Sequence, residues 1–197
     1  AAILYRLDAQ QGEVCRCDLA PGGSYSYMAI NAGLLWLGDM LNGTLLQLKL
    51  SDNSLTTWPL PPDSAPFGLA ADGQGGLWYA DSNTNAAGRL DPQTGQVRVY
   101  ALPARSLPTL VAATQGRLCY AEQSLGSTGC IDTAAASHTG FASTPSGSAI
   151  TPVCESVTPF ATGSVTITEG DLAWSPQTYE SIPAAAGKPY ALAMKDV

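Results

Sequence analysis

The sequence has little charge and a single histidine, and both shortages exclude classes of function. Only 13% of its 197 residues are charged, with a formal net charge of −7, whereas roughly 25% is typical. A weakly charged, acidic surface is a poor partner for nucleic acid or anionic membranes. The one histidine, His138, cannot complete a zinc site alone, and no serine carries the elbow motif of a Ser-His-Asp hydrolase.

Long apolar runs, helical periodicity and CxxC spacing are missing too. No apolar run approaches the roughly 18–20 residues of a membrane span, so the sequence predicts none. The five cysteines do not have the CxxC spacing of common zinc and redox sites. Few lysines, many Ser, Thr and Gly residues and cysteines able to pair predict an extracellular, cell-surface or periplasmic protein.

The sequence does contain a repeat of about 42 residues. Trp36 and Trp78 lie 42 residues apart, and Cys119 follows 41 residues later in a similar context. Turn residues and closing prolines keep the same period. In residues 96–102 valine and alanine alternate with polar residues, the period of a β-strand. A period of this length in a sequence rich in strand-forming residues is typical of propeller blades.

The repeat therefore predicts an all-β fold, a β-propeller of four-stranded antiparallel blades, with 1–197 as one domain or a partial propeller. Its units are a half blade at 1–21, blades at 22–61, 62–103, 104–145 and 146–183, and a first strand within 184–197. Two arrangements remain open. Either about five blades close by sharing one blade between the two ends, or the chain is part of a six- or seven-bladed ring.

Unit 62–103 carries the most regular copy: Pro66-Phe67-Gly68-Leu69-Ala70, Gly76-Leu77-Trp78-Tyr79-Ala80-Asp81 and Gly88-Arg89-Leu90-Asp91-Pro92. This string resembles the repeat of the streptogramin lyase (virginiamycin B lyase) family. The resemblance implies a propeller and a magnesium-assisted elimination that opens a cyclic peptide ester, with histidines and glutamates on one face. Since the chain has one histidine, near the expected outer strand of its unit, that site cannot be placed here.

Three acidic residues share one position of the repeat: Asp39, Asp81 and Glu122. In a propeller they lie at the ends of the second strands, on the face formed by the 2–3 and 4–1 loops. Either they form an acidic arc that binds Ca²⁺, Mg²⁺ or a basic group, or each caps its own hairpin by accepting turn N–H bonds. Asp81, Asn83 and Asn85 also space oxygen donors like the start of a calcium loop, without its glycine and distal glutamate.

The cysteines and one asparagine complete the candidates. Cys119 and Cys130 lie on neighbouring strands of one unit and face each other across a hairpin, which allows a disulfide. Cys154 holds the position of Cys119 in the next unit and is a rival partner. Free buried thiols are the alternative. Asn42 begins an N-glycosylation triplet, although Asn-Gly is also a preferred hairpin turn.

These observations predict a non-enzymatic secreted or cell-surface propeller that acts as a binding or assembly module. Its expected partners are a protein or another copy of itself, because blade faces left open by an incomplete ring favour association. No catalytic residue and no resident cofactor are assigned. The alternatives are a streptogramin-lyase-like C–O lyase acting on a cyclic peptide ester, and a structural subunit of an extracellular filament or coat.

Overall fold

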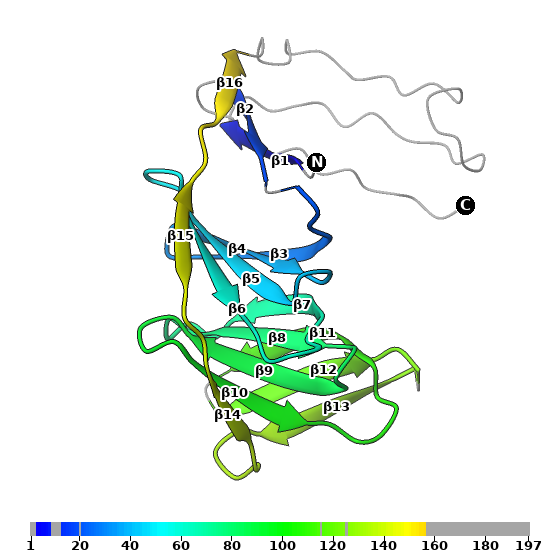
Figure 1. Cartoon of the computed structure of the whole chain (residues 1–197). Helices are drawn as coiled ribbons and strands as arrows, with labels where there is room; N and C mark the ends of the chain where they lie inside the picture. The colour runs from blue at the N-terminus through cyan, green and yellow to red at the C-terminus, as the bar shows by residue number, and fades with distance from the viewer. Residues whose placement is uncertain (1–2, 9–12, 20, 115, 125, 157–197) are drawn as a thin grey trace, which may run out of the picture. The chain divides into compact units, whose positions relative to one another are not determined.

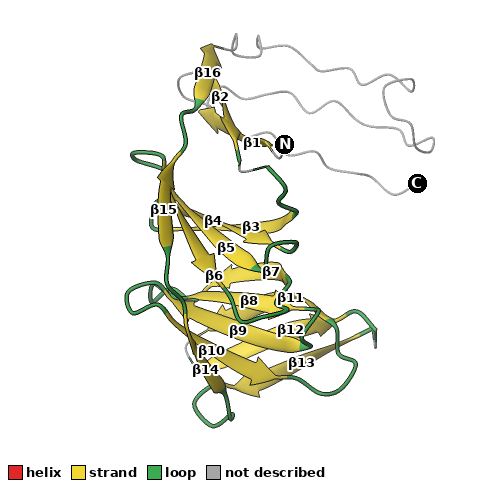
Figure 2. Ribbon diagram, in the orientation of Figure 1, coloured by secondary structure: helices red, strands yellow, loops and turns green. Residues whose placement is uncertain are grey.

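The computed structural model describes residues 3–8, 13–19, 21–114, 116–124 and 126–156. Over these residues the chain forms sixteen strands and no helix (Figures 1 and 2), which confirms the predicted all-β fold. The described part therefore contains no helix with the length and apolar character needed to cross a membrane. Spatial proximity divides the chain into two units, residues 1–4 with 17–152 and residues 5–16 with 153–197.

The first unit contains three successive antiparallel meanders, each with the strand order expected of a blade (Figure 1). The first blade consists of β3 (Tyr25–Asn31), β4 (Leu34–Asp39), β5 (Thr44–Lys49) and β6 (Ser54–Pro59). The second blade consists of β7 (Pro66–Ala71), β8 (Leu77–Asp81), β9 (Ala86–Asp91) and β10 (Gln96–Ala101). The third blade, as described, consists of β11 (Pro108–Thr114), β12 (Arg117–Glu122) and β13 (Ser127–Asp132).

Turn residues at repeated positions set the hairpins that join these strands. Asn53 and Gly95 precede the fourth strands of the first and second blades, with φ of 58° and 71°. Asparagine and glycine tolerate this left-handed conformation better than other residues. Their N–H groups donate to the carbonyls of Lys49 and Asp91, at 2.9 and 2.8 Å. The 3–4 turns are therefore equivalent, as the repeat predicts.

Apolar side chains between neighbouring blades form the core. Between the first and second blades lie Trp36, Leu45, Trp58, Leu60, Leu77, Tyr79, Leu90 and Val97. Between the second and third blades lie Trp78, Ala87, Tyr100, Leu102, Leu118 and Tyr120. Trp36 and Trp78, each 3% exposed, thus occupy equivalent settings against the following blade. Each blade shelters its neighbour, so the cores depend on stacking.

The first strands β3, β7 and β11 approach one another closely enough to require small residues. Ser26 on β3 donates through Oγ to the carbonyls of Pro66 and Phe67, at 3.1 and 2.8 Å. A Cβ atom added at Gly68 would overlap the carbonyl of Thr109 on β11. Glycine is therefore favoured at position 68 because the backbones of β7 and β11 approach each other closely there.

After the third blade the chain turns back and adds outer strands to the two earlier blades. Strand β14 (Thr139–Ala142) pairs antiparallel with β10, and β15 (Ser146–Ala149) pairs antiparallel with β6. Figure 1 shows β14 and β15, in olive and yellow, alongside these edges. Both blades become five-stranded sheets.

This return differs from the expected strand placement, in which the residues up to 145 complete the third blade. Phe141 instead packs against the core between the first and second blades. Ser143 donates through Oγ to the carbonyl of Pro59 at 2.7 Å. These contacts hold β14 on the second blade. The predicted unit boundaries, the single domain and the number of blades stay predictions. Most of unit 146–183 and all of 184–197 lie outside the described residues.

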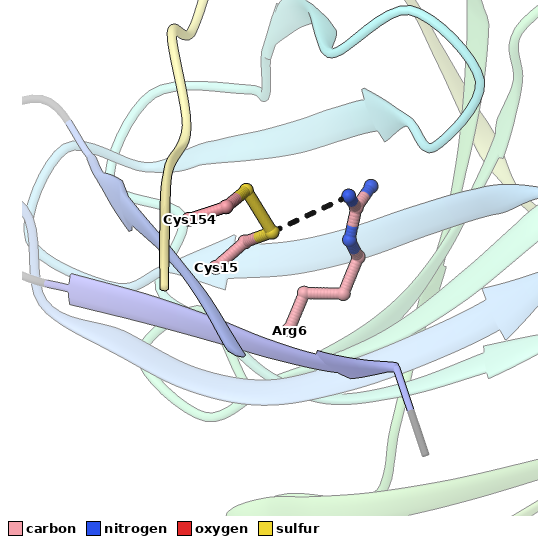
Figure 3. Close-up of a disulfide and its surroundings, with 3 residues drawn as sticks. All are labelled: Arg6, Cys15 and Cys154. Carbon is pink, nitrogen blue, oxygen red and sulfur yellow. Dashed lines mark hydrogen bonds between the residues drawn. A yellow bond between two sulfur atoms is a disulfide. The ribbon is translucent and has the colours of Figure 1, made fainter. Parts of the chain in front are cut away.

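The second unit contributes to a three-stranded sheet in the order β1-β2-β16. The strands of this sheet are β1 (Ile3–Asp8), β2 (Glu13–Asp18) and β16 (Val153–Ser156), of which residues 3–4 and 17–18 belong to the first unit. Cys154 stands opposite Cys15 in the antiparallel register and forms a disulfide with it. Figure 3 shows Arg6 beside this bond, donating through Nη2 to Cys15 Sγ at 3.5 Å. Cys154 is therefore not a rival partner of Cys119.

Candidate functional site

The three acidic residues of the repeat end the second strands of successive blades. Asp39, Asp81 and Glu122 close β4, β8 and β12, and they are 2%, 2% and 9% exposed. A buried carboxylate needs hydrogen-bond donors or a counter-charge to remain ionised. The neighbouring turn and the segment that enters the first strand supply these donors.

Asp39 shows the arrangement most fully. Its Oδ1 accepts from the backbone N–H groups of Leu41 and Asn42, both at 3.2 Å, and from Ser24 N–H at 3.0 Å. Its Oδ2 accepts from Asn42 Nδ2 at 2.8 Å. The carboxylate thus caps the 2–3 turn and ties it to the segment before β3.

The other two carboxylates repeat this arrangement with different donors. Asp81 Oδ1 accepts from the N–H groups of Thr84 and Ala65, at 3.2 and 3.0 Å. Glu122 instead accepts from two hydroxyls, Ser106 Oγ at 2.7 Å on Oε1 and Ser127 Oγ on Oε2. The hydroxyls of Ser127 and Ser106 lower the pKa of Glu122 below its usual range. These contacts agree with the interpretation in which the carboxylates cap the 2–3 hairpins.

Each of the three carboxylates lies beside a tyrosine whose pKa is raised. At Asp39 this is Tyr25, whose pKa is raised by burial and then by the charge of Asp39, and two further tyrosines lie beside Asp81 and Glu122. Burial, followed by the negative charge of Asp81, raises the pKa of Tyr79 well above its usual value. Burial and then Glu122 raise the pKa of Tyr120 in the same way. The rings of Tyr79 and Tyr120 each cover a glycine on the adjacent strand, because a Cβ at Gly88 or Gly129 would overlap them. These two tyrosines are therefore held neutral and fixed between the blades.

The predicted calcium loop also has its side chains committed to neighbouring backbone. Asn83 donates through Nδ2 to the carbonyl of Asp63 at 2.7 Å. Asn85 donates to the carbonyl of Pro103 at 2.8 Å and accepts from Leu107 N–H at 3.0 Å. Among the described residues no group of three or more His, Cys, Asp or Glu side chains could hold a metal ion. Ligand binding by these residues and by the acidic positions stays a prediction.

The glycosylation candidate lies at the first of these turns. Asn42 is exposed, and its Nδ2 donates to Asp39, as above, and to the carbonyl of Gly22 at 3.4 Å. The asparagine therefore takes part in the hairpin turn, the second of its two predicted roles. A sugar on Nδ2 would compete with these bonds, and glycosylation stays a prediction.

Within the first unit, the described residues cover one face of the first blade only in part. Leu35, Leu37 and their neighbours pack against Leu4, Cys17 and Leu19. On β3, however, Met28 and Ile30 are opposite Leu37 and Leu35 and are 58% and 66% exposed. Cross-strand partners share a face of the sheet, so both side chains continue the same apolar surface into solvent. Sequence analysis did not single out these residues.

Equivalent residues of the other blades show what covering this face does. Leu69 is opposite Tyr79 and packs against the core between the first and second blades. Val111 is opposite Tyr120 and packs against the core between the second and third. Met28 occupies the same register position, and within the described part of the first unit it is 58% exposed. We call the surface formed by Met28 and Ile30 the β3 face.

The third blade differs from the other two at its Trp position. Cys119 forms a disulfide with Cys130, its partner in the register, which is one of the alternatives that the hairpin allowed. The equivalent pairs are Trp36 with Gln47 and Trp78 with Arg89. Cys17 is the free cysteine, and it is buried. Disulfides of this kind are typical of proteins in oxidising compartments.

The histidine lies beside a pocket of about 440 Å³ near the 2–3 and 4–1 loops of the second blade. Its ring centroid is 5.4 Å from that of buried Tyr100. Much of the pocket wall is apolar, with Val99, Ala101 and Phe141 on it. Because no second histidine exists in the sequence, the pocket has no paired imidazoles for acid and base catalysis.

No protein-family model matches the sequence, and no curated protein matches it. The fold does resemble solved structures. One is streptogramin B lyase, at a TM-score of 0.54 and 21% identity over 71% of this chain and 50% of that chain. Another is a catalytically inactive virginiamycin B lyase from Staphylococcus aureus with quinupristin, at 0.55 and 19% over 70% and 54%. A third is the selenomethionine-substituted virginiamycin B lyase from Staphylococcus aureus, at 0.55 and 21% over 71% and 51%.

The chain thus spans about half the length of these structures. At this identity the likeness shows the fold, which agrees with the repeat resemblance found in the sequence. Fold alone does not determine function.

Proposed function

We propose that this chain is a non-enzymatic assembly module of the propeller fold, located outside the cytoplasm, which associates with a second copy through the β3 face. The observation that supports this most strongly is the exposure of Met28 and Ile30, at 58% and 66%. The equivalents of Met28 in the other blades, Leu69 and Val111, are packed between sheets, and the small residue Ala71 holds the position of Ile30 in the second blade. An apolar sheet face that continues a blade-to-blade core is suited to another sheet.

The energy available at this face is substantial. Full burial of one methionine or isoleucine side chain stabilises by roughly 1.5–3 kcal/mol. In a two-fold contact the same residues of both copies are buried, which doubles the number of covered side chains. The β3 face is therefore large enough to bias association but not to guarantee a tight complex, since association also costs translational and rotational freedom.

A closed pair is favoured over an open filament because the chemistry of the third blade does not match the β3 face. The side of the third blade equivalent to the Trp36 and Trp78 faces carries Ala112, Cys119 and Cys130. Ala112 and Cys130 are exposed there. Leu110, 46% exposed, lies on the same side, together with the exposed charged pair Arg117 and Asp132. This surface therefore carries one large apolar side chain among small and charged groups, and it is a poorer match for Met28 and Ile30 than a second β3 face. Head-to-tail growth from blade to blade is therefore less suited to these surfaces than a contact between two β3 faces.

Sedimentation velocity over a range of concentrations tests the proposal. The wild-type chain is expected to dimerise, and the double variant Met28→Thr/Ile30→Thr to remain monomeric. Leu41→Thr is the matched control, because Leu41 is 71% exposed but lies in the turn after β4. A wild-type chain that stays monomeric, a double variant that associates equally well, or a polymer of high mass would each contradict the proposal.

The second candidate function is that of a streptogramin-lyase-like C–O lyase, and the likeness to solved lyase structures favours it. The described residues do not fit the magnesium that such an activity implies, because their carboxylates do not gather into a metal-binding group. Incubation with quinupristin and Mg²⁺, followed by chromatography for ring opening, separates the two functions. Catalytic ring opening would replace the assembly proposal with the lyase.

A further inference from the structure

A second pocket lies between the second and third blades, at the edge where their 1–2 and 3–4 turns gather. This is the opposite end of the strands from the capping carboxylates. The pocket encloses about 310 Å³, near the lower end of the range for small-molecule sites. Charged side chains come from the second blade, and hydroxyl and small groups come mainly from the third. The residues that matter are Asp72, Arg89, Arg98, Gln74, Thr114 and Thr133.

One arginine of this pocket is held rigidly. Arg89 donates to Asp72 Oδ2 through Nε at 2.8 Å and through Nη2 at 2.5 Å. Asp72 Oδ1 accepts from the N–H groups of Gln74 and Gly76, at 2.8 and 2.9 Å. Although partial burial raises the pKa of Asp72, these N–H groups and Arg89 lower it below its usual range. Asp72 is therefore an anion at neutral pH, and its charge is already paired.

The other arginine has no such partner. Arg98 stands directly opposite Arg89 in the antiparallel register, so the two guanidinium groups share one face of the sheet. No hydrogen bond or ion pair joins Arg98 to any residue that the structure describes. Like charges directly opposite each other destabilise a sheet. One carboxylate against two guanidinium groups leaves this pocket with a net positive charge, in a chain whose formal net charge is −7.

The same register position in the first blade has no charge at all. There Gln47 is opposite Thr56, and Gln47 accepts from Trp58 Nε1 at 3.4 Å. The blade architecture therefore does not require two arginines at this position. Their presence in the second blade alone, beside a pocket, is the observation that carries the inference.

We propose that this pocket binds a small hydroxylated carboxylate, such as a hexuronic acid. Arg98 pairs with the carboxylate, because a planar guanidinium matches it through two parallel N–H bonds. Arg89, fixed by Asp72, adds positive charge from the other side. Thr114, Thr133 and Gln74 provide hydroxyl and amide groups for the hydroxyls of the ligand. The site is independent of the β3 face and goes beyond the assembly function.

Isothermal titration of the whole chain with sodium glucuronate tests the proposal. The wild-type chain is expected to show saturable binding, and neutral glucose to bind far more weakly. Arg98→Thr, which installs the residue of the first blade, is expected to weaken binding by roughly tenfold or more. Arg105→Asn is the matched control: it removes the same charge from an exposed turn after β10, at the opposite end of the strands from the pocket, and asparagine tolerates the φ of 70° there. This variant is expected to leave glucuronate affinity unchanged.

A second variant tests the hydroxyl contacts separately. Thr133→Val keeps the backbone N–H that donates to the carbonyl of Gly116 and removes only the hydroxyl, so weaker glucuronate binding is expected. No saturable binding to the wild-type chain would overturn the proposal. So would unchanged binding to Arg98→Thr, or displacement by sulfate as effective as by glucuronate. Binding retained by Met28→Thr/Ile30→Thr would show that this site stands apart from the assembly face.

Discussion

Cys119 stands opposite Cys130 at the register position where Trp78 stands opposite Arg89 in the second blade. The two blades thus use the same backbone position for different stabilising contacts. In the second blade a large ring is buried against the next blade. In the third blade a covalent bond between β12 and β13 replaces such a ring. The bond stabilises a sheet that, as described, has three strands where the other blades have five.

The two disulfides are expected to contribute unequally to stability. Cys119 and Cys130 are 11 residues apart, whereas Cys15 and Cys154 are 139 apart. A disulfide lowers the conformational entropy of the unfolded chain, and the resulting stabilisation grows with the length of the enclosed loop. It is about 3 kcal/mol for the short loop and about 5 kcal/mol for the long one. Chemical denaturation is expected to show a smaller loss of unfolding free energy for Cys119→Ala/Cys130→Ala than for Cys15→Ala/Cys154→Ala. A larger loss from the short-loop pair would contradict the account.

The stacking of blades is tested by Trp78→Ala. This ring lies between the second and third blades and is 3% exposed. Its removal is expected to cost about 3–5 kcal/mol of unfolding free energy, measured by urea denaturation. Leu41→Ala is the control, because Leu41 is exposed and its truncation should change little. Equal effects of the two substitutions would argue against a core between the blades.

The fit of tyrosine rings over glycines is tested by Gly88→Ala. A Cβ at Gly88 overlaps the ring of Tyr79, a fully buried side chain. Overpacking of this kind typically costs about 1–3 kcal/mol. Gly140→Ala on β14 is the matched control, because a Cβ there meets no atom within 4 Å. Thermal unfolding should separate the two variants, and similar melting temperatures would show that the ring moves aside freely.

The capping role of Glu122 predicts a change in acid stability. Its folded pKa is lowered by the hydroxyls of Ser127 and Ser106. A group with a lowered folded pKa adds stability above its unfolded pKa of about 4.3, and this stability is lost as the pH falls through the lower folded value. Glu122→Gln should therefore be less stable at neutral pH and lose less stability between pH 5 and pH 2.

The matched control for this measurement is Asp63→Asn. Asp63 is exposed, with a φ of 64° that asparagine tolerates. This variant is expected to follow the wild-type unfolding free energy across the acid range. A Glu122→Gln profile parallel to that of the wild-type chain would show that the carboxylate does not stabilise the fold through its charge.

The parts of the fold that could be predicted from the sequence are those fixed by periodic side-chain patterns. The spacing of Trp36 and Trp78 predicted equivalent buried settings, and the structure confirms them. The positions of Asp39 and Asp81 at strand ends predicted the turn N–H bonds as one of two interpretations. Large apolar residues and turn residues repeat because each blade packs against its neighbour and turns its strands at the same positions.

The return of the chain could not be predicted in this way. Strand β15 joins the first blade through backbone bonds at a sheet edge, and backbone bonds leave no pattern in the side chains. Strand β14 adds one packed apolar side chain, Phe141, and a single apolar residue does not make a recognisable period. The sequence of β15 is Ser146-Gly147-Ser148-Ala149, which has neither alternation nor apolar bulk. The Cys15–Cys154 bond follows from that return, so it was missed for the same reason. The arginine pair needed the register of β9 and β10 to become visible.

Oxidative footprinting of Met28 tests the central claim most directly. Hydroxyl-radical oxidation, quantified by mass spectrometry, reports the exposure of the methionine at the β3 face, and partly buried Met40, next to the β4 turn, serves as the internal reference. We predict that Met28 oxidises readily in dilute protein and becomes protected as the concentration rises, while Met40 does not change. Oxidation of Met28 at the same rate at every concentration would contradict the claim that a second copy covers this face.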